Sequence, residues 1–220
     1  MLDRQTSYIV RRQGDNVRNF YFVAIFNAQR ICSHEPAIVH TQYGNVSGYQ
    51  IELARVFYGI PFAQPPIGIL RWQPTLPVTK WDHKVINATQ PPPACSQPAS
   101  VINGIITPST MSEDCLYLNI FTPLIEDSSR ESLLPVMIVI HGGDFQFGWA
   151  SQSNFESERL VNTTNVIIAL IQYRIGALGF LATGNGPNGI KCNYGILDQR
   201  LAIAWIEANI NTVGRDPNEI

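Results

Sequence analysis

A glycine-rich segment, HGGDFQFG at residues 141–148, is the strongest candidate for a catalytic feature in this sequence. It follows the apolar run 136–140, which is typical of a buried strand. A strand that ends in a glycine-rich turn leaves several backbone N–H groups without a secondary-structure partner, and such groups can converge on a developing negative charge. An ordinary strand-to-loop turn is the competing interpretation, because paired glycines are common in turns. Taken alone, the segment leaves both interpretations open.

Several motifs along the chain resemble those of one enzyme family and occur in the expected order. The segment SEDCLYLNI at 112–120 resembles the signature of type-B carboxylesterases, the cholinesterase-like branch of the α/β-hydrolases. The other matching segments are YGIPFA at 58–63, PP at 65–66, LRW at 70–72, YRIG at 173–176, GFL at 179–181 and NYGILDQ at 193–199. The resemblance extends from about residue 37 to residue 220. It favours the interpretation of 141–148 as the oxyanion loop that esterases build from an HGGG-type motif.

The resemblance implies an α/β fold, namely the N-terminal portion of an α/β-hydrolase. Its central sheet is expected to be mostly parallel, with antiparallel N-terminal strands, and to be truncated before the nucleophile elbow. Residues 1–35 are expected to form an N-terminal extension, and residues 36–220 an incomplete carboxylesterase domain. An apolar stripe at helical spacing predicts a helix at 198–212. The expected strands lie at 38–41, 45–51, 55–58, 116–122, 136–140 and 166–173. The continuous apolar runs of the last two strands predict central strands covered on both faces.

No G-x-S-x-G motif occurs in the 220 residues. In the family that the chain resembles, this nucleophile elbow follows soon after a segment like 214–220, and the acid and the histidine of the triad come later. The resemblance therefore predicts a fragment of a serine-dependent carboxylic ester hydrolase, which has the oxyanion loop but no catalytic triad and is inactive alone. Two alternatives stay open: a non-catalytic, cholinesterase-like adhesion or binding protein, and an inactive truncated gene product.

The resemblance assigns the oxyanion donors to the backbone N–H groups of Gly143 and Asp144, in the loop that includes Gly142. Asp144 departs from the family, where a third glycine is usual. An ionised carboxylate about 4 Å from the oxyanion would cost about 4 kcal/mol at an effective dielectric constant of about 20, or about a thousandfold in rate. Three interpretations are open: the side chain turns away or takes up a proton, it weakens ester turnover, or it activates water against an unusual acyl or phosphoryl intermediate. His141 is expected to be structural, because the family takes its triad histidine from the far C-terminal part.

Further positions match structural features of the family. The resemblance implies a disulfide between Cys95 and Cys115, and buried ion pairs between Arg71 and Glu113 and between Arg174 and Asp198. A disulfide that closes a loop of this length contributes about 3 kcal/mol in the chain-entropy model, and it persists in an oxidising compartment. The cysteine spacings suit neither a zinc site nor a C-x-x-C redox pair. The resemblance implies no metal and no organic cofactor.

Composition and short motifs bear on location and partners. The net charge of −2 and the pI of about 6.1 give no basic surface for nucleic acid, and no apolar run is long enough to span a bilayer. N-x-S/T triplets make Asn45, Asn87 and Asn162 candidate glycosylation sites. The apolar run 20–26 resembles a signal peptide with a long basic region, with a stray strand or a mis-assigned first exon as the alternative. These features favour a secreted or extracellular protein.

The expected substrate is a small-molecule carboxylic ester. Cholinesterases carry a tryptophan between their first two cysteines, which binds quaternary ammonium groups by cation–π contact. Residues 96–114 of this chain contain no aromatic residue, so a choline ester is disfavoured. The sequence carries no signal for a particular ester or for an oligomeric state.

Overall fold

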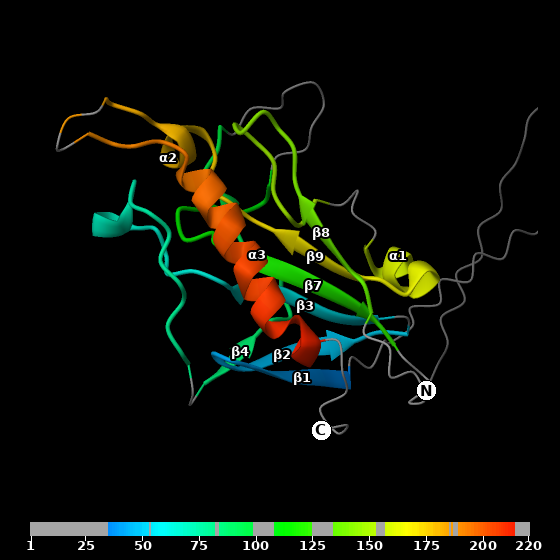
Figure 1. Ribbon diagram of the computed structural model, residues 1–220. Coiled ribbons are helices and arrows are strands. Elements are labelled where there is room, and N and C mark those ends of the chain that lie inside the picture. Colours follow the sequence, from blue (N-terminus) through cyan, green and yellow to red (C-terminus); the bar gives the residue numbers. More distant parts are fainter. Residues whose placement is uncertain are drawn as a thin grey trace, which may run out of the picture. The chain divides into compact units, whose positions relative to one another are not determined.

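The computed structural model describes residues 35–213, apart from residues 53, 82–83, 99–107, 125–133, 153–156, 185 and 187–188. Residues 1–34 of the expected N-terminal extension, with the apolar run 20–26, lie outside the described residues. The described part of the chain forms a β-sheet with helix α3 (Tyr194–Val213) running across it (Figure 1). Two short helical turns, η1 (Gly68–Leu70) and α2 (Gly176–Phe180), lie in the connections.

Seven strands of the described residues form one sheet, in the order β1-β2-β3-β7-β9-β8, with β4 beside β2 (Figure 1). Their bounds are Glu35–Thr41 (β1), Gly44–Gln50 (β2), Ala54–Pro61 (β3), Val85–Asn87 (β4), Tyr117–Pro123 (β7), Val136–Ile140 (β8) and Ile167–Ile171 (β9). Neighbours from β1 to β9 are antiparallel. Within the described residues, parallel pairing in this sheet is limited to β8–β9 and β4–β2. The sheet is therefore mixed. Its antiparallel N-terminal strands agree with the prediction, whereas the mostly parallel central sheet that the resemblance implies is not found among the described strands, because β3, β7 and β9 pair antiparallel.

A second, two-stranded sheet lies in the segment that carries the disulfide. Strands β5 (Ala94–Cys95) and β6 (Met111–Ser112) pair in parallel. The pairing continues one residue past β5, because the N–H of Ser96 donates to the carbonyl of Ser112, the last residue of β6, at 3.1 Å. This small sheet holds the residues around Cys95 in an extended conformation.

Strand β9 is buried along its whole length and contributes to two core clusters. Its odd-numbered residues belong to the cluster that includes Trp205 of helix α3 (Tyr194–Val213). Its even-numbered residues belong to the cluster that includes Val161 of helix α1 (Ser157–Thr164). Since successive side chains of a strand point to opposite faces, β9 is covered on both faces, as its continuous apolar run predicts.

Strand β8 differs from the prediction. Its apolar run indicated a central strand, but Met137 is 47% exposed and Ile140 is 43% exposed. The reason is its position, because β8 pairs with β9 alone among the described strands and therefore lies at the edge of the sheet. An apolar run by itself does not distinguish an edge strand from a central one.

Helix α3 begins at Tyr194, earlier than the start predicted at Asp198. Asn193 precedes it with a φ of 64°, and the carbonyl of Asn193 accepts the first two backbone hydrogen bonds of the helix, at 3.1 and 3.2 Å. Gly195, in the first turn, weakens the sequence signal for a helix. A Cβ at Gly195 would overlap the carbonyl oxygen of Arg174, so glycine permits close packing of the helix start on the segment after β9.

Candidate active site

The loop 141–148 leaves the carboxyl end of β8 beside the segment that follows β9. Because β8 and β9 are parallel, the residues that follow both strands meet at the same edge of the sheet. The hydroxyl of Tyr173 donates a hydrogen bond to the carbonyl of His141 at 2.8 Å. The rings of the two residues stack, with centroids 4.5 Å apart. The start of the loop is therefore anchored to the segment after β9.

Gly143 shapes the turn of this loop. Its carbonyl accepts hydrogen bonds from the N–H groups of Gln146, at 2.8 Å, and Phe147, at 3.1 Å. Its φ of 123° favours glycine, and a Cβ there would overlap the carbonyl oxygen of Phe147. Asp144 and Phe145 follow in the left-handed region, with φ of 51° and 59°. Only glycine fits at position 143, and the residues after it turn the chain back on itself.

The backbone N–H groups of Gly143 and Asp144 are the expected oxyanion donors. Among the hydrogen bonds between described residues, none has either of these groups as its donor. The turn is closed through the carbonyl of Gly143, which leaves the two consecutive N–H groups available to an external acceptor. Backbone donors that converge on one point stabilise the negative charge that develops on a carbonyl oxygen during acyl transfer, which is the role that the resemblance assigns to these two groups.

The side chain of Asp144 is exposed. Water screens an exposed carboxylate more effectively than a protein interior does. Water therefore screens this charge in the described chain.

His141 is buried, at 4% exposure, and lies within the loop. Burial lowers the pKa of its imidazole, and the hydrogen bond of Nδ1 with the carbonyl of Gly142, at 3.1 Å, opposes that effect. A Cβ at Gly148 would come within 2.6 Å of the same nitrogen. The ring is enclosed by the loop backbone and by Tyr173, in keeping with a structural role.

The disulfide that the resemblance implies is present, between Cys95 and Cys115. Both cysteines are buried, at 3% and 1% exposure. Cys95 ends strand β5, and Cys115 lies just before strand β7. The bond therefore fastens the segment around Cys95 to the central sheet.

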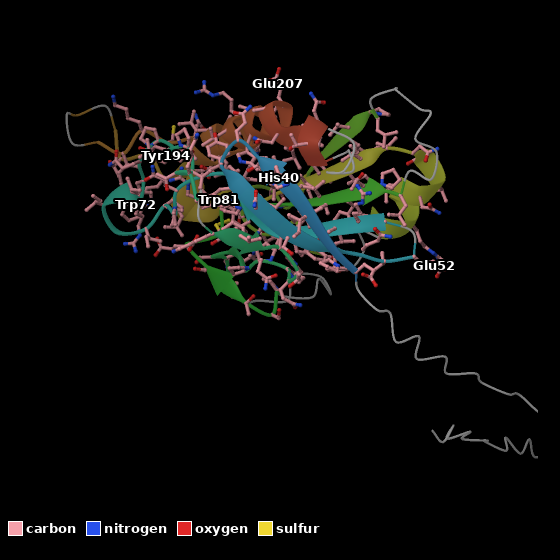
Figure 2. The ribbon with its side chains drawn as sticks, turned by 90° about the horizontal axis from the view of Figure 1, so that it is seen from below. His40, Glu52, Trp72, Trp81, Tyr194 and Glu207 are labelled. Atoms are coloured by element: carbon pink, nitrogen blue, oxygen red, sulfur yellow. A yellow bond between two sulfur atoms is a disulfide. The ribbon has the colours of Figure 1, made fainter. Side chains whose placement is uncertain are left out.

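The ion pair of Arg174 with Asp198 is buried, and the two side chains are 3% and 0% exposed. The Asp198 carboxylate accepts hydrogen bonds from the backbone N–H of Arg174 at 2.9 Å, from its Nε and Nη2 at 2.8 Å each, and from the Thr75 hydroxyl. The guanidinium also lies 5.3 Å from the ring centroid of Tyr194, which Figure 2 labels. This pair joins the segment after β9 to the start of α3.

The second ion pair is partly exposed, whereas the resemblance implied a buried one. Arg71 donates to both carboxylate oxygens of Glu113, at 2.5 and 2.6 Å, and the side chains are 39% and 28% exposed. The hydrogen bonds and the charge of Glu113 raise the pKa of the Arg71 guanidinium. The exposure follows from the position of Arg71 directly after η1, a projecting turn in which Ile69 is 92% exposed.

Residues 35–220 match the profile of the carboxylesterase family. The chain belongs to this family. Carboxylesterase 1F from Mus musculus is 41% identical over 207 residues, which cover 86% of this chain and 36% of that protein. Liver carboxylesterase 1 from Oryctolagus cuniculus is 40% identical over 200 residues, which cover 84% of this chain and 34% of that protein. The chain thus spans about a third of the length of these family members.

Solved esterase structures also resemble this family member. A thermophilic PNB esterase superimposes with a TM-score of 0.72 at 36% identity, over 82% of this chain and 37% of that chain. A second PNB esterase gives a TM-score of 0.70 at 38% identity, over 82% of this chain and 36% of that chain. The fold is that of the α/β-hydrolases, as the sequence predicts, and the chain corresponds to part of that domain.

The three candidate glycosylation sites differ in their accessibility. Asn87, in β4, is exposed, and its Oδ1 accepts a hydrogen bond from the Thr89 hydroxyl at 2.8 Å. Asn162 is exposed on α1. Asn45 is half-buried, with its Oδ1 2.7 Å from Nδ1 of His40, which Figure 2 labels on the β1–β2 hairpin. Glycosylation of all three stays a prediction.

Two further observations concern membranes and metals. No helix in the described part of the chain is long and apolar enough to cross a membrane. The same residues contain no group of three or more His, Cys, Asp or Glu side chains that could hold a metal ion.

Two glutamines that were not expected from the sequence to be functional hydrogen-bond the backbone at and just after the C-terminal end of the loop. Gln97 hydrogen-bonds the backbone of Gly148, and Gln172 hydrogen-bonds the backbone of Ala150. The sequence signal for both was weak, because a glutamine near a cysteine or at the end of an apolar run has no particular meaning.

Proposed function

We propose that this chain supplies the oxyanion-stabilising part of a serine-dependent carboxylic ester hydrolase. The observation that most directly supports the proposal is the pair of consecutive backbone N–H groups, at Gly143 and Asp144, that donate to no described residue. Membership of the carboxylesterase family supports a small-molecule carboxylic ester as the substrate.

The chemistry assigned to the loop is electrostatic. When a hydroxyl nucleophile adds to the ester carbonyl carbon, the carbonyl oxygen becomes an oxyanion, and the two N–H groups donate hydrogen bonds to it. The turn at Gly143 holds these donors in advance, so they need not reorganise as the charge develops. Loss of one such donor typically lowers kcat by about 10²–10³.

We also propose that the 220-residue chain alone does not turn over esters, since its sequence contains no G-x-S-x-G elbow. The buried, stacked ring of His141 makes this histidine a poor candidate for a general base. The test is the hydrolysis of p-nitrophenyl acetate by the purified chain. Saturable turnover that copurifies with the chain through successive columns would contradict this part of the proposal.

A chimaera tests the role of the loop itself. Residues 35–220 would replace the aligned segment of Carboxylesterase 1F from Mus musculus, which is 41% identical. In this chimaera Gly143→Ala should lower kcat by about 10²–10³, because the added Cβ overlaps the Phe147 carbonyl and displaces the donors. The control is Gly186→Ala, where a Cβ meets nothing within 4 Å. Equal kcat values for the two variants would refute the proposed role.

Asp144 favours a second candidate function, that of a non-catalytic binding protein. Its exposed carboxylate stands at a position where the resemblance leads us to expect glycine. The chimaera distinguishes the two functions. Activity with Asp144 present supports the hydrolase, whereas activity that appears only after Asp144→Gly supports the binding protein.

We propose that the protein is secreted and glycosylated. The disulfide and the exposed side chain of Asn87 support this proposal, because disulfides persist in oxidising compartments. Expression in a secreting animal cell, followed by enzymatic deglycosylation, tests it. The secreted chain should lose mass on deglycosylation, and Asn87→Gln should remove one glycan. An unglycosylated chain that is retained in the cytosol would contradict the proposal.

A further inference from the structure

The C-terminal end of the oxyanion loop is held by the side chain of Gln97. The Oε1 atom of Gln97 accepts a hydrogen bond from the N–H of Gly148 at 2.9 Å. Its Nε2 atom donates to the carbonyl of Gly148 at 3.0 Å and to the carbonyl of Cys95 at 3.0 Å. One side-chain amide therefore satisfies both backbone groups of Gly148 and ties them to a disulfide-bonded residue.

A second glutamine makes a parallel connection. The Oε1 atom of Gln172, which is 1% exposed, accepts a hydrogen bond from the N–H of Ala150 at 3.3 Å. Its Nε2 atom donates to the carbonyl of Pro93 at 2.6 Å. Together the two glutamines connect residues 148–150 to residues 93–97, and the Cys95–Cys115 disulfide fastens the latter segment to the sheet.

Gly148 is in direct contact with the part of the loop that precedes the donors. Its φ is 113°, and a Cβ there would overlap the carbonyl oxygen of Gly142 and approach Nδ1 of His141 to 2.6 Å. Close-packed atoms transmit small displacements, because the interior has no free space to absorb them. The position of Gly148 therefore constrains Gly142, and with it the N–H groups of Gly143 and Asp144.

We propose that Gln97 and Gln172 are positioning residues for the oxyanion loop, which they lock to the disulfide-bonded segment 93–97. Neither glutamine contacts a reacting atom in this assignment, and both act through Gly148 and Ala150. The inference rests on the proposed function, in which the N–H groups of Gly143 and Asp144 stabilise an oxyanion.

Substitution of Gln97 should loosen the loop most, because its side chain makes three hydrogen bonds and that of Gln172 makes two. Gln97→Met retains a side chain of similar length but removes three hydrogen bonds, and it leaves the buried N–H and carbonyl of Gly148 without these partners. Local opening of the loop should then become about tenfold to a hundredfold more frequent. Gln97→Glu removes only some of these hydrogen bonds. An ionised carboxylate still accepts a hydrogen bond from the N–H of Gly148, but it repels the carbonyl oxygens of Cys95 and Gly148. A protonated carboxyl group donates to one of them again.

Hydrogen exchange on the purified, oxidised 220-residue chain tests the proposal. Exchange would be followed in peptides that cover 141–150, with peptides from α3 as the reference for global unfolding. The matched control is Gln90→Met, because Gln90 is exposed and lies in the same proline-rich segment. Gln97→Met and Gln172→Met should accelerate exchange in 141–150 and leave α3 unchanged. The same local exchange in Gln97→Met and in the Gln90→Met control would overturn the proposal.

The glutamate variant decides the question if Gln97→Met unfolds the whole chain. Relative to wild type at the same pH, Gln97→Glu should expose 141–150 at about pH 7 and regain protection at about pH 4, where a glutamic acid side chain takes up its proton. A difference from wild type that does not change with pH would overturn the proposal, because a general loss of packing does not depend on this proton.

Kinetics of the chimaera separate this inference from the proposed function. Gln97→Met should lower kcat about tenfold or more with little change in KM, because the donors act in the transition state more than in the ground state. A loosened loop with unchanged kcat would leave the positioning role intact but refute the oxyanion function. An unchanged loop would refute the positioning role whatever the kinetics.

Discussion

Replacement of Asp198 by asparagine should strongly destabilise the chain. The Asp198 carboxylate is fully buried and accepts hydrogen bonds from the backbone N–H, the Nε and the Nη2 of Arg174, as well as from Thr75. Asp198→Asn preserves the shape but removes the charge, which leaves the 3% exposed guanidinium without a counter-ion. Breaking a buried ion pair by changing one partner costs about 3–5 kcal/mol. That is a large share of the about 5–15 kcal/mol by which a typical domain is stable.

The chain offers a matched control in its other ion pair. Glu113→Gln makes the same carboxylate-to-amide change opposite Arg71, where the side chains are 39% and 28% exposed. Exposed ion pairs stabilise a protein far less than buried ones, and the two hydrogen bonds of this pair place it toward the upper end of that small contribution, so the variant should unfold much closer to wild type than Asp198→Asn does. The assay is urea unfolding followed by the fluorescence of the four tryptophans. If the urea midpoint falls equally in Asp198→Asn and Glu113→Gln, the prediction is wrong, because burial would then not decide how much each ion pair stabilises the chain.

Three further predictions concern the loop and the sheet edge. In the chimaera, Asp144→Gly should raise kcat/KM by about fivefold to a thousandfold. A charge about 4 Å from the oxyanion costs about 1 kcal/mol in bulk water and about 4 kcal/mol at an effective dielectric constant of about 20. Equal kcat/KM values would mean that the carboxylate has no electrostatic effect. Burial lowers the pKa of His141 in the folded chain. Below about pH 6.5 the unfolded chain therefore binds more protons than the folded chain does, and the free energy of unfolding should fall as the pH drops through that value. His141→Gln should flatten this dependence in urea titrations, and an unchanged slope would contradict it. Met137→Lys should reduce aggregation of the chain, measured by light scattering, because Met137 is 47% exposed on the edge strand β8. Unchanged scattering would count against association through this edge.

The sequence was sufficient for the family, for most of the strands and for the loop that carries the candidate chemistry. The strand at 136–140 has the same bounds in the structure, and β9 lies within the predicted run at 166–173. These elements were predictable because β-branched runs and turn residues are local signals. The burial of β8 was not predictable, because it depends on which strand lies beside it.

Contacts between distant segments account for the other differences. The early start of α3 depends on Gly195 packing against the backbone of Arg174, and the exposure of Arg71 depends on the projection of η1. The hydrogen bonds between Gln97 and Gly148 and between Gln172 and Ala150 join residues that are 51 and 22 positions apart. No pattern within either segment predicts the partner. The resemblance supplied the disulfide and the ion-pair partners, whereas it supplied nothing on how the loop is held.

In the proposed function, the N–H groups of Gly143 and Asp144 bind an oxyanion. The most direct test is a crystal structure of the chimaera with a trifluoromethyl ketone, which reacts with a catalytic serine to form a tetrahedral adduct. The adduct oxygen should lie about 2.7–3.1 Å from both backbone nitrogens. An adduct oxygen that points away from the loop, with neither nitrogen within hydrogen-bonding distance, would rule out this role for the two N–H groups.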